Sequence, residues 1–224
     1  MATIVLVPGA CHGGWWFEPL ARRLAELGHD AHPVTLAGVS ERAGELSGRV
    51  NLESHVAETV ELVRATAAEQ VVLVGHSYAG SVITGVADAV PERIAALLYL
   101  DAFVPADGDS CWTMTNDEQR RWYIDDAGDT GLAVNPLPFF DPRASAHPLA
   151  AFVQRSRLSG AWRAVPVKHY ALAAAPQWLP VSPFVPTADR LRADPEWTVH
   201  DLPIGHNVLA GGPDLVLDLI LPLV

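Results

Sequence analysis

The chain has 224 residues, of which 50% are hydrophobic and 18% are charged, so it is long and apolar enough to fold around a sizeable core. Its formal net charge of −11 argues against a nucleic-acid partner and against an anionic membrane surface. Cys11 and Cys111, the only cysteines, do not make a disulfide framework, so a reducing cytoplasm is the expected location. The apolar run Ala2–Val7 is too short for a signal peptide or a membrane span.

Hydrophobic patterning predicts alternating strands and helices over the first hundred residues. Thr3–Val7 is typical of a buried strand, and a glycine-rich turn from Pro8 to Gly14 follows it. The next expected elements are a helix with apolar residues from Trp16 to Leu27, a strand at His32–Leu36, a loop at Ala37–Val50, a helix capped by Asn51, a strand at Val71–Val74, a helix carrying Val82–Val86 and a strand at Ala95–Leu100. Apolar strands that alternate with helices predict a mostly parallel sheet covered on both faces.

Residues from about 105 to 165 break this rhythm. The segment is rich in aromatic residues and proline and lacks a strand pattern. We interpret it as a lid inserted into a single domain spanning residues 1–224, and the alternative is an ordinary helical excursion that covers the core. Alternation then resumes with a strand near His169–Ala174, a helix near Phe184–Asp194, a strand at Trp197–Leu202 and a last helix from Pro213.

The most informative motif is Gly75-His76-Ser77-Tyr78-Ala79-Gly80, which directly follows the strand at Val71–Val74. A strand, a tight turn between small residues with a serine at its apex, and a helix behind it make a nucleophile elbow. The fifth position of the usual G-x-S-x-G pattern is Ala79, which is still small. Ser77 is therefore the predicted nucleophile, and it needs a base within hydrogen-bond reach because a free serine is a poor nucleophile.

His206 is the predicted base, because it follows the last predicted strand on a turn opened by Gly205. In this architecture that turn lies at the carboxyl edge of the sheet, beside the elbow. His12, in the first turn, either lines the pocket or packs. Since no histidine shows zinc-ligand spacing, no metal is expected. The remaining histidines are interpreted as packing or surface residues: His29, His32, His55, His76, His147, His169 and His200.

Taken together, these motifs resemble the α/β-hydrolase superfamily, and more closely the small cofactor-independent esterases related to plant methylesterases and hydroxynitrile lyases. The resemblance is carried by Val5–Trp15, Gly75–Gly80, Tyr99–Pro105 and Leu202–His206, which span nearly the full length in the order that the family uses. It implies an α/β fold with a doubly wound, mostly parallel sheet, a small helical lid after the sixth strand, and a serine mechanism without a cofactor.

The acid that holds the imidazole tautomer is harder to place. Many α/β-hydrolases carry it after the seventh strand, but here the strand near His169–Ala174 leads into Ala175-Pro176-Gln177-Trp178, which has no carboxylate. The family has a second position after the sixth strand, where Asp101 stands, so Asp101 is the predicted acid. The alternative role for Asp101 is a strand-end cap. Asp189 and Asp201 are the reserve acids, in a predicted helix and in the last strand.

The backbone N–H groups of Ala10 and Tyr78 are the expected oxyanion hole, because one lies in the first turn and the other follows the nucleophile. Substrate contacts are expected from His12 and from two aromatic residues of the lid, Trp112 and Trp122. The predicted activity is hydrolysis of a small, mostly apolar or aromatic ester through an acyl-enzyme.

Two other functions stay open on the same fold. Hydroxynitrile-lyase relatives carry a threonine in the first turn and a lysine next to the catalytic histidine, where this chain has Gly9 and Asn207, which favours an esterase. The second is a ligand-binding receptor with little turnover. A dinucleotide site is disfavoured, because the first turn does not fit G-x-G-x-x-G.

Overall fold

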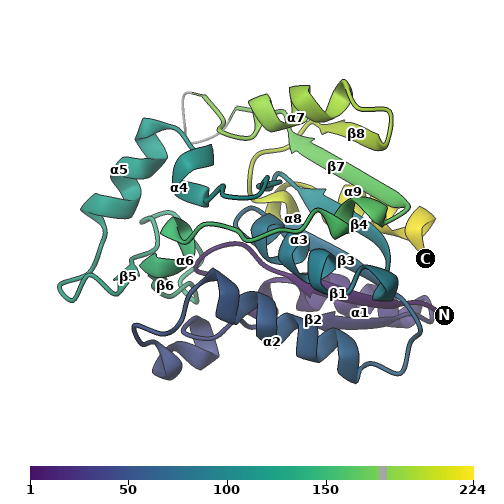
Figure 1. The fold of residues 1–224 in the computed structure, drawn as a ribbon, viewed down its shortest axis with the longest axis horizontal. Coiled ribbons are helices and arrows are strands. Elements are labelled where there is room, and N and C mark those ends of the chain that lie inside the picture. Colours follow the sequence, from purple (N-terminus) through teal and green to yellow (C-terminus); the bar gives the residue numbers. More distant parts are fainter. Residues whose placement is uncertain (177–180) are drawn as a thin grey trace.

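Six strands form one parallel sheet in the order β2-β1-β3-β4-β7-β8. The computed structural model describes residues 1–176 and 181–224 (Figure 1). The strands are β1 (Thr3–Val7), β2 (Asp30–Pro33), β3 (Val71–His76), β4 (Ile94–Leu100), β5 (Ala133–Val134), β6 (His147–Pro148), β7 (Val167–Ala173) and β8 (Trp197–Leu202). The helices are α1 (Glu18–Glu26), α2 (Leu52–Ala65), α3 (Ala79–Ala89), α4 (Cys111–Met114), α5 (Asp117–Asp125), α6 (Leu149–Val153), α7 (Val185–Arg192), α8 (Val208–Gly211) and α9 (Pro213–Ile220). Short 3-10 turns lie at Gly14–Trp16, Ser40–Glu45, Pro91–Arg93, Ala161–Ala164 and Leu221–Leu223.

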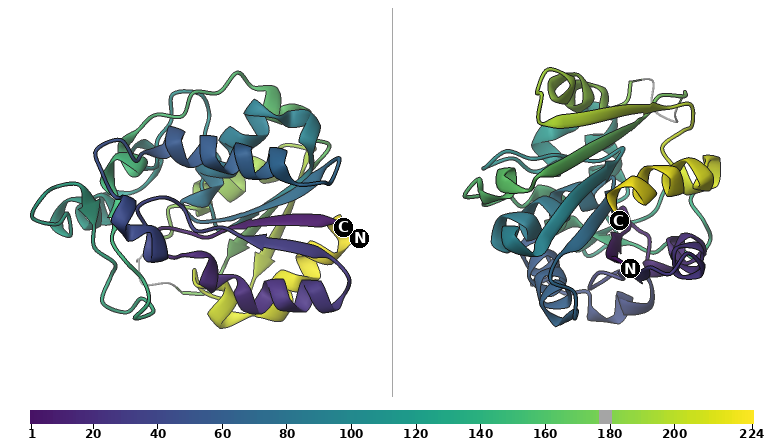
Figure 2. Two further views of the ribbon diagram at one scale, coloured as in Figure 1. Left: turned by 90° about the horizontal axis from the view of Figure 1, so that it is seen from below. Right: turned by 90° about the vertical axis from the view of Figure 1, so that its right-hand side faces the viewer.

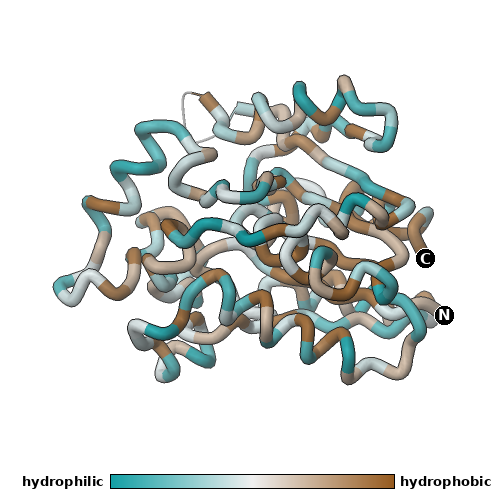
Figure 3. The backbone as a smooth tube through the Cα atoms, viewed as in Figure 1, coloured by the Kyte–Doolittle hydropathy of each residue, from teal (hydrophilic) through white to brown (hydrophobic). Residues whose placement is uncertain are grey.

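Helices cover both faces of the sheet, as Figure 2 shows from the side. Alternate residues of β1 face opposite layers, because side chains of a strand alternate between the two faces. Val5 and Val7 pack in a core with α2, α3 and α7, whereas Ile4 and Leu6 pack with α1, α8 and α9. Hydrophobic residues accordingly gather along the central strands (Figure 3). The predicted doubly wound, mostly parallel sheet is confirmed.

The sequence pattern misplaced the edge strand β2. A strand was expected at His32–Leu36, but β2 runs from Asp30 to Pro33. Within the described parts of the chain β2 pairs with β1 alone, and its residues are exposed or half-buried. Val34 and Leu36 are buried in the loop beyond the strand instead, so their apolar character marks packing above the sheet edge and not strand structure.

The segment expected to be a lid follows β4, the fourth strand along this chain, which stands where the resemblance implied the sixth strand of the family. It holds the short helices α4, α5 and α6, as expected of a helical insertion. It also holds a small antiparallel sheet of β5 and β6, which the sequence did not predict. Strands of two residues are too short to produce an alternating pattern. A lid function for this segment, and a single domain over residues 1–224, stay predictions.

Over residues 1–176 and 181–224, no helix is both long and apolar enough to cross a bilayer.

The helix after Asn51 begins as predicted. The Asn51 side chain accepts a hydrogen bond from the Ser54 backbone amide (3.0 Å), and the Ser54 hydroxyl accepts one from the Asn51 amide (2.9 Å). This reciprocal capping satisfies two backbone donors at the start of α2.

Two buried histidines are expected to make the fold sensitive to acid. Burial lowers the pKa of His76 and of His147 well below the ordinary value of 6.5. Below pH 6.5 the unfolded chain therefore binds protons that the folded chain does not. The free energy of unfolding consequently decreases as the pH is lowered. Urea denaturation should show a decline between about pH 7.5 and 5.5, of up to ~1.4 kcal/mol per pH unit for each histidine.

A His147→Asn variant provides the matched test. The His147 Nδ1 atom accepts a hydrogen bond from the Cys11 amide at 3.3 Å, and an asparagine oxygen can take over that acceptor role. The variant should show a shallower pH dependence than the wild type, whatever its absolute stability. A wild-type free energy of unfolding that stays constant or rises over this interval would contradict the expectation.

Candidate active site

The turn after β3 has the strained backbone of a nucleophile elbow. Ser77 has a φ of 53°, in the left-handed region that non-glycine residues rarely adopt. Its amide donates to the Leu100 carbonyl (3.2 Å), and its carbonyl accepts from the Phe103 amide (3.1 Å), so the end of β4 fixes the turn. A Cβ atom on Gly80 would lie 2.0 Å from the Phe103 oxygen. The close approach of these two segments therefore requires glycine one position later than the usual motif places it.

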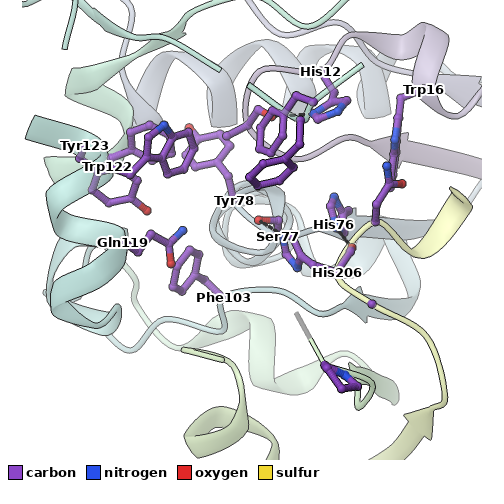
Figure 4. Close-up of a pocket in the computed structure, with 17 residues that line it drawn as sticks. His12, Trp16, His76, Ser77, Tyr78, Phe103, Gln119, Trp122, Tyr123 and His206 are labelled. Atoms are coloured by element: carbon purple, nitrogen blue, oxygen red, sulfur yellow. Dashed lines mark hydrogen bonds between the residues drawn. The ribbon is translucent and has the colours of Figure 1, made fainter. Parts of the chain in front are cut away.

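Three side chains meet at this turn, and Figure 4 shows two of them, Ser77 and His206. His206 Nε2 lies 3.1 Å from Ser77 Oγ, and His206 Nδ1 lies 2.6 Å from Asp101 Oδ2. Because a carboxylate accepts, Nδ1 carries the proton and Nε2 is left to accept from the serine hydroxyl. The side chains follow β3, β4 and β8, whose carboxyl ends lie along one edge of the parallel sheet.

The neighbouring strand fixes the position of Asp101, whose side chain is fully buried. Asp101 is 0% exposed, and its φ of 44° is again left-handed. Its amide donates to the Ala171 carbonyl at 2.7 Å, and its Oδ1 atom accepts from the Ala173 amide at 3.1 Å. Both contacts come from β7, the neighbouring strand, so the carboxylate is aimed at His206 by the sheet itself.

The two reserve acids lie elsewhere. Asp189 is paired with Arg192 at 2.8 Å, and Asp201 bonds the same guanidinium. Both carboxylates are mostly exposed, and neither is bonded to His206. Gln177 and Trp178, part of the turn in which the sequence shows no carboxylate, lie outside the described residues.

His206 is also positioned by two aromatic neighbours, of which the sequence marked His76 as a packing residue but did not mark Phe184. Phe184 stacks on the imidazole with ring planes 8° apart and centroids 5.2 Å apart. The His76 ring lies 4.6 Å from it, and His76 Nε2 donates to the His206 carbonyl at 2.8 Å. Burial lowers the pKa of His76, so this neighbour stays neutral beside the base. Trp16 stacks on His76 in turn, 4.6 Å between centroids, which agrees with the packing role expected for that histidine.

The first turn supplies a free amide beside the serine. Within residues 1–176 and 181–224, the Ala10 and Tyr78 amides donate no hydrogen bond to the protein, and both residues line the same cavity as Ser77. The Ala10 carbonyl accepts from His12 Nδ1 at 2.7 Å. Cys11 has a φ of 68° and is buried outside the cavity lining, and burial raises the pKa of its thiol.

A mostly aromatic cavity of about 290 Å³ opens above Ser77. Among the described residues that line it, none is lysine, arginine, aspartate or glutamate. Its described lining consists of Ala10, His12, Trp16, His76, Ser77, Tyr78, Phe103, Gln119, Trp122, Tyr123, Phe139, Phe140, Phe152, Pro176, Gly205, His206 and Asn207. Such a wall selects for neutral, apolar or aromatic groups.

Of the expected substrate contacts, His12 and Trp122 line this cavity and Trp112 does not. Trp112 lies on α4 beside a separate surface hollow, where the Arg120 guanidinium sits 6.0 Å above its ring. Its expected role as a substrate contact is therefore corrected. The sequence missed Gln119 and Tyr123, although their spacing from Trp122 puts all three on one face of a helix.

No group of three or more histidine, cysteine, aspartate or glutamate residues suited to a metal ion occurs among the described residues. The arrangement at Ser77 brings together a serine hydroxyl, an imidazole, a buried carboxyl group and two backbone amides that donate to no described protein group. These are the parts needed for attack on a carbonyl carbon.

Comparisons with known proteins indicate the family of the chain. The sequence model of the alpha/beta hydrolase family matches residues 4–219. The carbendazim hydrolyzing esterase of Nocardioides sp. is 34% identical to this chain, over 96% of each chain. Salicylic acid-binding protein 2 of Nicotiana tabacum is 31% identical over 65% of this chain and 59% of its own length.

Solved structures show the same fold. An extracellular alpha/beta-hydrolase from a Paenibacillus species matches with a TM-score of 0.83 and 21% identity, covering 99% of this chain and 98% of its own. The pyrethroid hydrolase PytH matches with a TM-score of 0.82 and 20% identity, covering 99% and 96%. At these identities the likeness concerns the fold alone.

Proposed function

Because the chain belongs to the alpha/beta hydrolase family, we propose that it is a serine esterase with Ser77 as its nucleophile. The observation that carries the proposal is the hydrogen-bonded series from Ser77 through His206 to Asp101 at the cavity. Its tautomer leaves His206 Nε2 ready to remove the serine proton as the oxygen attacks an ester carbonyl. Asp101 then stabilises the imidazolium that forms.

The rest of the cycle uses groups already in place. The Ala10 and Tyr78 amides donate to the oxyanion of the tetrahedral intermediate. When this intermediate collapses, the C–O bond to the alcohol breaks and His206 returns its proton to the departing oxygen. A water molecule, deprotonated by His206, hydrolyses the acyl-enzyme and releases the carboxylic acid and free Ser77.

The cavity supports a small, neutral substrate that is mostly apolar or aromatic. Its volume of about 290 Å³ is at the lower end for ligand pockets, and its described walls carry no acidic or basic residue. The relative from Nocardioides is named an esterase, which supports the same class of reaction.

Lyase chemistry fits this site poorly. A Cβ atom on Gly9 would lie 2.6 Å from His76 Nδ1, so the threonine of the lyase relatives does not fit the first turn unless His76 moves. Asn207, next to His206, is uncharged, and its side chain accepts from the Ala210 amide at 3.2 Å as the cap of α8. No lysine stands there to balance a cyanide anion.

The test combines covalent labelling with a substrate panel. A fluorophosphonate probe should label the purified protein at Ser77, identified by peptide mass spectrometry. Esters of short and aromatic acids should be hydrolysed, whereas a cyanohydrin should release no cyanide above the spontaneous rate. Cyanide release without ester hydrolysis would favour the lyase, and tight ligand binding without turnover would favour a receptor.

A further inference from the structure

One polar side chain of the cavity wall has no place in the mechanism above. Helix α5 presents Gln119, Trp122 and Tyr123 to the cavity, because residues three and four apart share a helix face. Gln119 is buried, only 6% exposed, and its side chain points from α5 toward the cavity between Phe103 and Tyr123 (Figure 4). Its neighbours in this part of the wall are aromatic.

The carboxamide of Gln119 is fixed from one side. The Thr115 hydroxyl donates to Gln119 Oε1 at 2.5 Å, which leaves the Nε2 group as the end that is not engaged. Among the residues that the structure describes, Nε2 has no hydrogen-bond partner. Asn116 caps the helix through the Gln119 amide at 3.0 Å and donates to the Val181 carbonyl at 2.8 Å, so the start of α5 is anchored.

An amide donor that is not engaged by the described protein and faces the cavity is available to hydrogen-bond a ligand. We infer that Gln119 is a specificity-determining residue, whose Nε2 group donates a hydrogen bond to an acceptor atom of the substrate. This inference rests on the proposed esterase function. The ester carbonyl itself is assigned to the Ala10 and Tyr78 amides, so the acceptor contacted by Gln119 belongs to another part of the substrate.

The residues that line the cavity around Gln119 indicate the chemical class of the acceptor that it contacts. The acceptor is neutral, because no lysine or arginine is among the described lining residues to balance an anion. The preferred substrates are therefore small esters whose aromatic or apolar group carries a ring nitrogen, an ether oxygen or a second carbonyl. The aromatic wall holds the ring, and Gln119 selects the heteroatom.

Matched ester pairs test this directly. We would measure kcat/KM for methyl benzoate against the three methyl pyridinecarboxylates, and for benzyl acetate against the three pyridylmethyl acetates. Each pyridyl-to-phenyl ratio is compared between the wild type and Gln119→Met, so that intrinsic reactivity cancels. For at least one isomer the wild-type ratio should exceed the Gln119→Met ratio by roughly tenfold, the value of one good hydrogen bond.

Two further variants separate recognition from packing. Thr115→Val keeps the shape but frees the carboxamide, so it should lower the same ratio while Gln119 remains. Gln154→Met makes the same exchange as Gln119→Met outside the described cavity lining, where Gln154 Oε1 accepts from the Glu53 amide at 2.8 Å, so its ratio should equal that of the wild type.

Equal ratios in the wild type and Gln119→Met for every isomer would overturn the inference, as would a loss in Gln119→Met that affects phenyl and pyridyl esters alike. Hydrolysis of these esters without such a difference would leave the proposed esterase function standing. A wild type that hydrolyses none of the esters, and is not labelled at Ser77, would instead remove the proposed function itself.

Discussion

Replacing Ser77 by alanine is expected to lower kcat for ester hydrolysis by several orders of magnitude, with roughly 10⁶ the precedent for a triad serine. The variant lacks the atom that forms the acyl-enzyme, so only direct attack by water remains. Alanine is small enough for the elbow, and the left-handed φ of 53° is already strained in the wild type, so the fold should survive. The measurement is kcat on p-nitrophenyl acetate, with fluorophosphonate labelling as a second readout.

Ser81, on the helix α3 that follows the turn holding Ser77, provides the matched control. It is buried one turn further along α3, its hydroxyl lies 3.6 Å from Cys111 Sγ, and it is not among the described lining residues of the cavity. Ser81→Ala should therefore keep its turnover and its labelling. Wild-type turnover by Ser77→Ala, or labelling that persists in it, would remove Ser77 from the proposed mechanism.

Sequence patterns located most of the sheet because its central strands are apolar throughout. β1 and β8 have the predicted bounds, and the start of α9 is at the predicted residue. Patterns failed at the edge strand β2, although the other edge strand β8 was predicted correctly, and in the two-residue strands β5 and β6, which are too short to show a pattern.

Some residues of the site could likewise be predicted from the sequence, and others could not. Parallel strands place their carboxyl ends together, so residues that directly follow strands, such as Ser77 and Asp101, were predictable neighbours. The stacking of Phe184 on His206 was not, because it depends on a contact between segments that no spacing links. Gln119 was missed although its spacing from Trp122 places both residues on one helix face. Trp112 was expected at the cavity because it is aromatic, but aromatic character alone does not predict on which side of a short helix a ring lies.

Replacing Asp101 by asparagine is the second large effect, with a loss in kcat of about 10⁴ as the precedent for a triad aspartate. The Ala173 amide donates to Asp101 Oδ1, so an asparagine must keep its oxygen there and turn its NH₂ group toward His206 Nδ1. His206 Nδ1 would then have to accept, which puts the proton on Nε2. A protonated Nε2 cannot remove the proton of Ser77.

The backbone makes this substitution a clean test. Asparagine tolerates the left-handed φ of 44° at position 101 well, so the folded state should be kept and a loss of kcat reports on the tautomer. Asp189→Asn is the control, because that carboxylate is mostly exposed and pairs with Arg192. It should retain wild-type kcat on the same ester. The opposite pattern, with Asp189→Asn inactive and Asp101→Asn near wild type, would move the acid to the helix α7 and leave Asp101 as a strand-end cap.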